Sequence, residues 1–194
     1  MPVFSFWMFI LIASFTPGPN NIMAMAYANR YGLRKTIPFC LGVGTGFSLL
    51  LMMCSVANLL LVQWIPFIRL PLTVLGVVYM LYLAYQMVAD SGETSTTQSN
   101  RQPRLFWTGL WIQFLNPKGI LFSLSVVSTF ILPYYSSLIH YIGFAVLLGA
   151  VGVCSSFSWS LGGALFQTWL QRHRRLFNWT MALLLVWTAI LLLL

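Results

Sequence analysis

Two short polar stretches interrupt apolar runs of this chain, and their side chains could bind a small charged molecule. Residues 16–21 are Thr-Pro-Gly-Pro-Asn-Asn, and residues 116–119 are Asn-Pro-Lys-Gly. Proline removes a backbone donor and glycine weakens a helix, so neither stretch continues a regular helix. Both lie in apolar runs long enough to cross a membrane, where broken backbone is tolerated only if protein covers it or it lines a cavity. The two stretches therefore predict a binding site inside the membrane.

Lys118 is the residue of this site that most strongly indicates function. A cation near a helix centre costs roughly 2.5–3.5 kcal/mol on insertion scales. Its side chain could extend to the membrane surface, although about twelve residues separate it from either end of its run. A structural ion pair lacks a partner, because the two acidic residues, Asp90 and Glu93, both lie in a polar loop. We therefore expect Lys118 to pair with an anionic group of a ligand that binds and is released.

The helix breaks could supply the remaining contacts to a zwitterion. Half-helices that begin after Pro19 and Pro117 would present free N–H groups and a positive dipole end to a carboxylate. The asparagine and threonine side chains add neutral partners for an ammonium group, and Tyr79 lies deep enough to donate into a cavity. For residues 16–21 an ordinary kink is the alternative. The expected substrate-binding residues are Thr16, Pro17, Gly18, Pro19, Asn20, Asn21, Tyr79, Asn116, Pro117 and Lys118.

The composition is that of an integral membrane protein. The 194 residues are 59% hydrophobic and 6% charged, with a mean hydropathy of +0.85. The net charge of +8 does not indicate a nucleic-acid partner, because the cations form short clusters between apolar runs. The three cysteines have no CxxC spacing, so neither a disulfide framework nor a zinc site is predicted. We expect no cofactor, no metal and no catalytic residue.

Six apolar segments predict an all-α fold of six transmembrane helices, of which the first and fourth are broken. Each is close to the ~20 residues that a spanning helix needs. No cationic side chain precedes Arg30, so the first segment is expected to be a retained helix rather than a signal peptide. Gly42, Gly44 and Gly46 predict close helix packing. The segments are residues 3–28, 38–62, 70–89, 105–132, 139–161 and 177–194.

The cations predict the orientation of these segments. Eight of them follow the first, third and fifth segments, whereas the alternate loops contain only Arg69. The positive-inside rule then places the three basic loops in the cytoplasm and both termini in the periplasm. The eight cations are Arg30, Arg34, Lys35, Arg101, Arg104, Arg172, Arg174 and Arg175.

The chain is expected to be a single transmembrane domain of two halves, residues 1–89 and 105–194. Residues 90–104 are polar and predict a flexible cytoplasmic connector. Each half has an odd number of segments, so a repeat between them must be inverted, which is typical of transporters with broken helices. At an offset of 100 the matching pairs are Thr16 with Asn116, Pro17 with Pro117, Cys54 with Cys154 and Ser55 with Ser155.

Four motifs resemble the LysE/RhtB family of amino-acid exporters: TPGPNNIM, YGLRK, GVVYMLYLAY and QFLNPKGILF. The resemblance runs over essentially the whole chain. It implies efflux of small neutral amino acids across a bacterial inner membrane, driven by the proton gradient. The stretch from QFLNPKGILF onward and the C-terminal segment are most similar to the branch that exports cysteine and O-acetylserine. Homoserine or threonine-type substrates stay open as an alternative.

The reading from the residues agrees with an exporter that alternates access to a midplane site between its halves. A cationic substrate such as lysine would need an intramembrane carboxylate, and the sequence has none. Two other classes of protein are alternatives: a passive channel, and a thiol oxidoreductase using Cys54 and Cys154. The second lacks a CxxC motif and would place its thiols in apolar surroundings. The expected partners are a small amino acid and the lipid bilayer, and a homo-oligomer is left open.

Overall fold

The computed structural model describes residues 1–61, 65–89, 104–166 and 172–193, and within these ranges the chain is helical and has no strand. This confirms the all-α prediction, while the expected connector at residues 90–104 lies almost wholly outside the described residues. The helices are α1 (Val3–Phe15), α2 (Pro19–Tyr31), α3 (Leu33–Leu61), α4 (Ile65–Ala89), α5 (Leu105–Leu115), α6 (Pro117–Val126), the π-helical η2 (Val127–Ile131), α7 (Leu138–Leu165) and α9 (Arg174–Leu193).

The first and fourth apolar segments are broken where proline and glycine predicted it. α1 and α2 meet at an angle of 47°, and α5 meets the helix formed by α6 and η2 at 66°. Each bent pair is apolar and long enough to cross a membrane when it is counted as one span. The same holds for the single helices Leu33–Val56, within α3, and Leu138–Leu165. α4 and α9 contain shorter apolar stretches, Thr73–Gln86 and Arg175–Ile190, so the length test alone does not give six spans.

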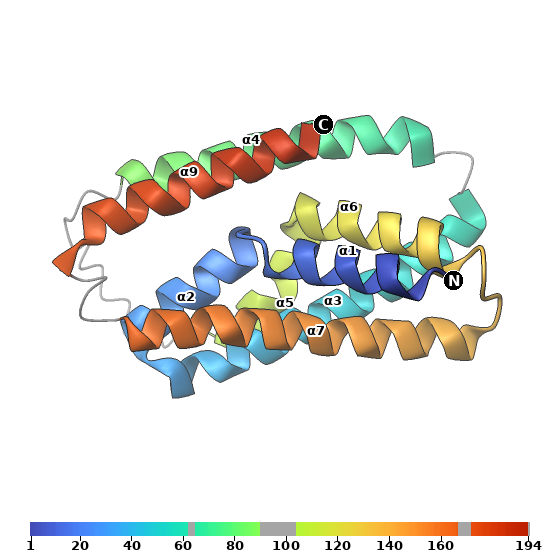
Figure 1. The fold of residues 1–194 in the computed structure, drawn as a ribbon, viewed down its shortest axis with the longest axis horizontal. Coiled ribbons are helices and arrows are strands. Elements are labelled where there is room, and N and C mark those ends of the chain that lie inside the picture. The colour runs from blue at the N-terminus through green and yellow to red at the C-terminus, as the bar shows by residue number, and fades with distance from the viewer. Residues whose placement is uncertain (62–64, 90–103, 167–171, 194) are drawn as a thin grey trace.

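α3 lies at the centre of the packing. It contacts α5 and α7 along its length, and α2 packs between α7 and α3. α4 and α9 pack side by side and form a separate layer along one side of the molecule, with α1 and α6 between this layer and α7 (Figure 1).

Glycines bring the backbones of the central helices into contact. A Cβ atom on Gly42 would lie 2.0 Å from the carbonyl oxygen of Phe106 on α5, and one on Gly46 would lie 2.5 Å from that of Leu110. Gly44 faces the other neighbour, since its Cβ would lie 2.8 Å from the carbonyl oxygen of Gly149 on α7. The prediction of a close-packing glycine face on this segment is therefore confirmed, and the face contacts two helices.

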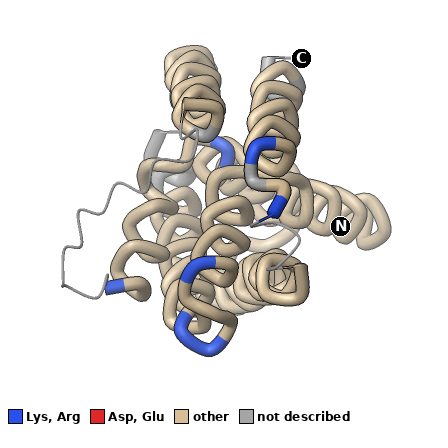
Figure 2. Tube along the Cα trace, turned by 90° about the vertical axis from the view of Figure 1, so that its left-hand side faces the viewer, with Lys and Arg blue, Asp and Glu red and all other residues tan. Residues whose placement is uncertain are grey.

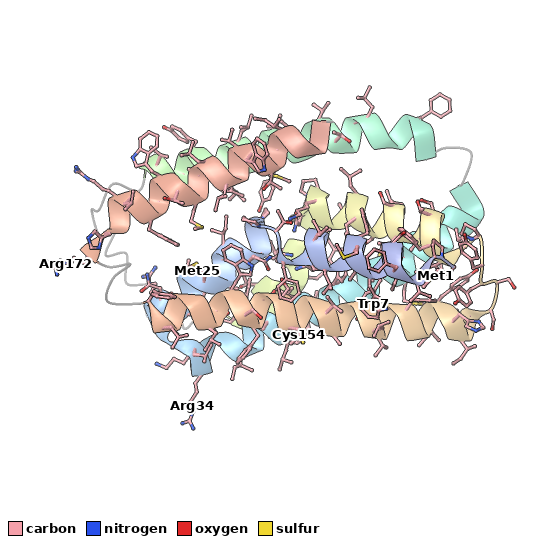
Figure 3. The ribbon with its side chains drawn as sticks, in the orientation of Figure 1. Met1, Trp7, Met25, Arg34, Cys154 and Arg172 are labelled. Carbon is pink, nitrogen blue, oxygen red and sulfur yellow. The ribbon has the colours of Figure 1, made fainter. Side chains whose placement is uncertain are left out.

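The basic segments gather at one end of the molecule. Arg34 and Arg172 lie at this end and Met1 lies at the other (Figure 3). The view onto this end shows blue Lys and Arg segments and no red (Figure 2), because Asp90 and Glu93 lie outside the described residues. Cations that follow the first and the fifth apolar segments of the sequence therefore lie at the same end of the structure.

Candidate functional site

The two helix breaks lie against each other, joined by Lys118. Its ammonium nitrogen donates to the carbonyl oxygens of Thr16, at 3.2 Å, and Pro17, at 3.3 Å. Gly18 allows this approach, since a Cβ there would lie 3.3 Å from both Cδ and Nζ of Lys118. Stretches about a hundred residues apart in the sequence therefore form one site.

The residues at each break explain why the helices stop there. Gly18 precedes α2 in an extended conformation, and Pro19 occupies the first helical position, where its missing N–H costs nothing. Pro117 holds the same position in α6. Asn116 caps α6, because its Oδ1 accepts from the backbone N–H of Lys118 at 3.1 Å, whereas α2 has no side-chain cap.

The first break leaves carbonyl groups at the end of α1 without helical partners, and side chains from other helices bind them. Asn21 Nδ2 donates to the carbonyl oxygens of Ser14, at 2.8 Å, and Thr16, at 3.1 Å. Ser155 Oγ on α7 also donates to Ser14, at 2.7 Å, and lies 3.2 Å from Asn21 Oδ1.

Two further donors complete this arrangement. Trp159 Nε1 on α7 donates to the carbonyl oxygen of Phe15 at 3.2 Å. Thr188 Oγ1 on α9 donates to that of Pro17 at 3.0 Å, beside Lys118. Every carbonyl from residue 14 to residue 17 thus accepts a hydrogen bond from outside the α1 backbone.

A second polar pair also joins the two halves of the chain at this site. Asn20 Nδ2 donates to Gln113 Oε1 at 2.8 Å, and Gln113 on α5 is 1% exposed. Asn20 Oδ1 is buried and has no hydrogen-bond partner among the described residues. A buried acceptor without a partner is costly, so this oxygen is available to a donor from a ligand or water.

These groups surround a cavity of about 70 Å³. A water molecule needs roughly 10–15 Å³ by this measure, so the cavity holds several waters or a ligand of a few non-hydrogen atoms. Its lining combines polar residues with apolar ones. The lining residues are Ala13, Ser14, Gly18, Asn20, Asn21, Val43, Phe47, Gln113, Asn116, Lys118, Gly119, Phe122, Gly152, Ser155 and Ser156.

Lys118 is the one charged side chain among these lining residues. It forms no ion pair with a described residue, since both acidic residues of the chain lie outside the described part. Among the described residues, no cluster of His, Cys, Asp or Glu could hold a metal ion. The arrangement is therefore suited to binding an anionic group beside neutral polar groups.

Most residues predicted from the sequence meet in this site. Thr16 and Pro17 contribute their carbonyl groups, while Pro19 and Pro117 start the half-helices. Tyr79 is the exception: it lies half-buried on α4 and does not line the cavity. The predicted residues that line the cavity are Gly18, Asn20, Asn21, Asn116 and Lys118.

Sequence reasoning did not identify several polar residues of the site. Gln113 stands three residues before Asn116 in an apolar run, and that position was a usable signal. Ser155 had a weaker signal, since it matches Ser55 at the offset of 100. The other missed residues are Ser14, Ser156, Trp159 and Thr188.

Known transport proteins resemble this chain over nearly its whole length. Residues 11–194 match the family model described as LysE type translocator. The cysteine/O-acetylserine efflux protein of Klebsiella pneumoniae subsp. pneumoniae is 34% identical over 186 residues, covering 96% of this chain and 94% of that protein. The proteins of the same name from Salmonella typhimurium and Escherichia coli are 34% and 33% identical over the same shares of the chains. No solved structure matches. The chain therefore belongs to the LysE type translocator family and is a multi-pass membrane transporter, not an enzyme.

Proposed function

We propose that this protein exports small neutral amino acids across the bacterial inner membrane, with cysteine and O-acetylserine as the favoured substrates. The observation that carries the proposal is Lys118, which lines a cavity between two broken helices and has no acidic partner among the described residues. Its relatives are named for the efflux of these two compounds and resemble it over nearly the whole chain, which supports the choice of substrates.

Lys118 is proposed to bind the substrate carboxylate. A hydrogen bond to a charged group contributes ~1.5–3 kcal/mol, which is enough to distinguish a carboxylate from its amide or ester. The rest of the cavity offers neutral groups, such as Asn20, Asn21 and Gln113. A lysine-like substrate would bring a second positive charge next to Lys118, and no described acid would offset it.

The packing supports an inverted repeat that alternates access to this site. α3 of the first half packs on the broken helix of the second half, α5 and α6. α7 of the second half correspondingly packs on the broken helix of the first, α1 and α2. The remaining strong contacts, α3 with α7 and α4 with α9, join equivalent helices of the two halves. Six spans related in this way would place the site at the interface that transporters of this kind move.

The end of the molecule that contains Arg34 and Arg172 is proposed to face the cytoplasm, with both termini in the periplasm. A reporter that is active only in the cytoplasm should be silent when fused after Leu194 and active when inserted near Ser95. Activity at both positions would show that a span has been miscounted.

A transport assay tests the proposed function. Cells loaded with radiolabelled cysteine should lose the label faster when the protein is overproduced, and an uncoupler should abolish the difference. Flux that continues along the substrate gradient after uncoupling would instead indicate a passive channel. Parallel assays with O-acetylserine, homoserine and threonine identify the substrate class. Unchanged efflux of all four amino acids in overproducing cells would contradict the proposal.

No observation favours the thiol oxidoreductase that Cys54 and Cys154 suggested. Cys54 is buried and Cys154 is exposed, and neither is in a disulfide. Replacing both with serine should leave export intact.

A further inference from the structure

The present partners of Lys118 are poor ones for a charged amine. Ammonium groups bind carboxylates at about 2.7–2.9 Å, whereas Lys118 contacts two neutral carbonyls at 3.2 and 3.3 Å. A substrate carboxylate would therefore attract Lys118 away from Thr16 and Pro17. The two carbonyl oxygens would each keep one neutral donor, Asn21 Nδ2 for Thr16 and Thr188 Oγ1 for Pro17, but would lose their charged donor.

These carbonyls are suited to a cation. They lie at the C-terminal end of α1, where the helix dipole is negative, and Thr16 is the C-cap residue of that helix. The group that now binds them is a primary ammonium with three donors. The α-ammonium group of an amino acid has the same charge and the same donors.

The space for such a group is next to Lys118. Gly18 has no side chain to fill it and lines the cavity with Asn20, whose Oδ1 is buried without a partner among the described residues. A second ammonium group at this position would find carbonyl acceptors and a free amide oxygen.

We propose that the Thr16 and Pro17 carbonyls form the ammonium subsite of the transporter, and that Lys118 occupies it as a tethered substitute until a zwitterion displaces it. The inference rests on the proposed function. On binding, the carboxylate pairs with Lys118 and the α-ammonium group takes over the carbonyls. Both ends of the substrate are needed, since the carboxylate alone leaves the carbonyls without a charged donor and the ammonium group alone leaves Lys118 without an acceptor.

This exchange would couple binding to movement. Lys118 belongs to the second half of the chain and the two carbonyls to the first, so their hydrogen bonds tie the halves together. A substrate bound between Lys118 and the carbonyls would replace these direct hydrogen bonds with hydrogen bonds from each half to the ligand. A ligand shifts a conformational equilibrium only through such differential contacts.

Three ligands test the proposal on the purified full-length protein. Equilibrium dialysis under reducing conditions measures how well each displaces radiolabelled cysteine. Cysteamine is cysteine without its carboxylate, and 3-mercaptopropionate is cysteine without its ammonium group. For the wild type, both analogues should bind at least about tenfold more weakly than cysteine, the equivalent of ~1.4 kcal/mol.

Lys118→Met gives the sharper result. It removes the tethered ammonium and leaves the carbonyls without a charged donor, so direct binding of radiolabelled cysteamine should strengthen at least about tenfold, a change of ~1.4 kcal/mol. Binding of 3-mercaptopropionate should weaken. Lys35→Met removes the other lysine of the chain, which is exposed at the far end of α2 and α3, and should change neither. If Lys118→Met is poorly expressed, Lys118→Gln replaces it.

The outcomes separate this inference from the function on which it rests. Cysteine binding with equally tight 3-mercaptopropionate binding would overturn the ammonium subsite and leave the proposed function standing. Unchanged cysteamine binding to a folded Lys118→Met protein would show that Lys118 only caps α1. A wild-type protein that binds none of the proposed substrates would overturn both proposals.

Discussion

The two helix breaks look alike in the sequence but are held in different ways. The break of α5 and α6 is capped locally, because Asn116 binds the backbone N–H of Lys118 two residues away. The break of α1 and α2 depends on distant residues, since its carbonyls bind side chains from α6, α7 and α9. The first break thus supplies acceptors, and the second supplies the charge. A site for a zwitterion would use both, so we infer that the asymmetry within the proposed repeat serves substrate binding.

Removing the charge of the second break should have the largest effect. Lys118→Met has a similar shape, avoids the cost of a cation in the membrane and should insert at least as well as the wild type. Loss of a charged hydrogen bond worth ~1.5–3 kcal/mol should lower cysteine export about 10–100-fold. Lys118→Arg keeps the charge with a different geometry and should retain partial activity. Normal export by Lys118→Met at normal membrane levels would show that Lys118 does not bind the carboxylate.

Closing the first break should come next. In a Pro17→Ala/Pro19→Ala protein, α1 and α2 could form a continuous helix whose own N–H groups bind the carbonyls that Lys118 now uses. Export should fall, whereas stability should not, because each replacement removes a proline that costs ~3 kcal/mol in a helix interior. Pro38→Ala is the control, because Pro38 lies inside α3 and is exposed. Thermal unfolding and export are both measured. Wild-type export from the double variant would show that the break is only a kink without a role in transport.

The sequence predicted the positions of both breaks because proline and glycine act on their own backbone. It also identified Lys118, because a charged side chain within an apolar run is unusual whichever way the helix packs. The partners of the first break were not predictable in the same way. A serine or threonine in an apolar helix commonly bonds the carbonyl four residues earlier, as Ser158 does with Cys154. Only the packing decides that Ser155 reaches across to Ser14 instead.

The position of Tyr79 outside the cavity lining could not be predicted for the same reason. Its expected depth in the third segment does not determine which side of the helix faces a cavity. α4 packs on α9, and the residues lining the cavity come from other helices. The family resemblance could not correct this, because it concerned motifs rather than the faces of helices.

Ser155 and Ser158 allow the distant support of the first break to be measured. Ser155→Ala removes a donor to Ser14 from a position that is 2% exposed. Asn21 still donates to Ser14, but Asn21 Oδ1 loses the hydroxyl that lies 3.2 Å from it. The loss should be ~1–3 kcal/mol of stability and should appear as a lower midpoint of thermal unfolding. Ser158→Ala, on the same helix, removes only an exposed bond to its own helix and should have little effect. Equal shifts in the two variants would mean that the first break does not depend on α7.

Thr188 should give the smallest effect, and it tests whether α9 takes part in the site. Thr188 and Thr180 both lie on α9 and both donate to the carbonyl four residues earlier, at 2.7 and 2.8 Å. Thr188 differs in also donating to Pro17, one of the two carbonyls that Lys118 binds. Thr188→Val keeps the shape and removes the hydroxyl, at a cost of ~0.5–1.5 kcal/mol for one neutral hydrogen bond. The Pro17 carbonyl keeps its bond to Lys118, so export should fall only about two- to tenfold, in line with that loss. Thr180→Val should export at the wild-type rate, and a Thr188→Val protein that does the same would leave α9 outside the transport mechanism.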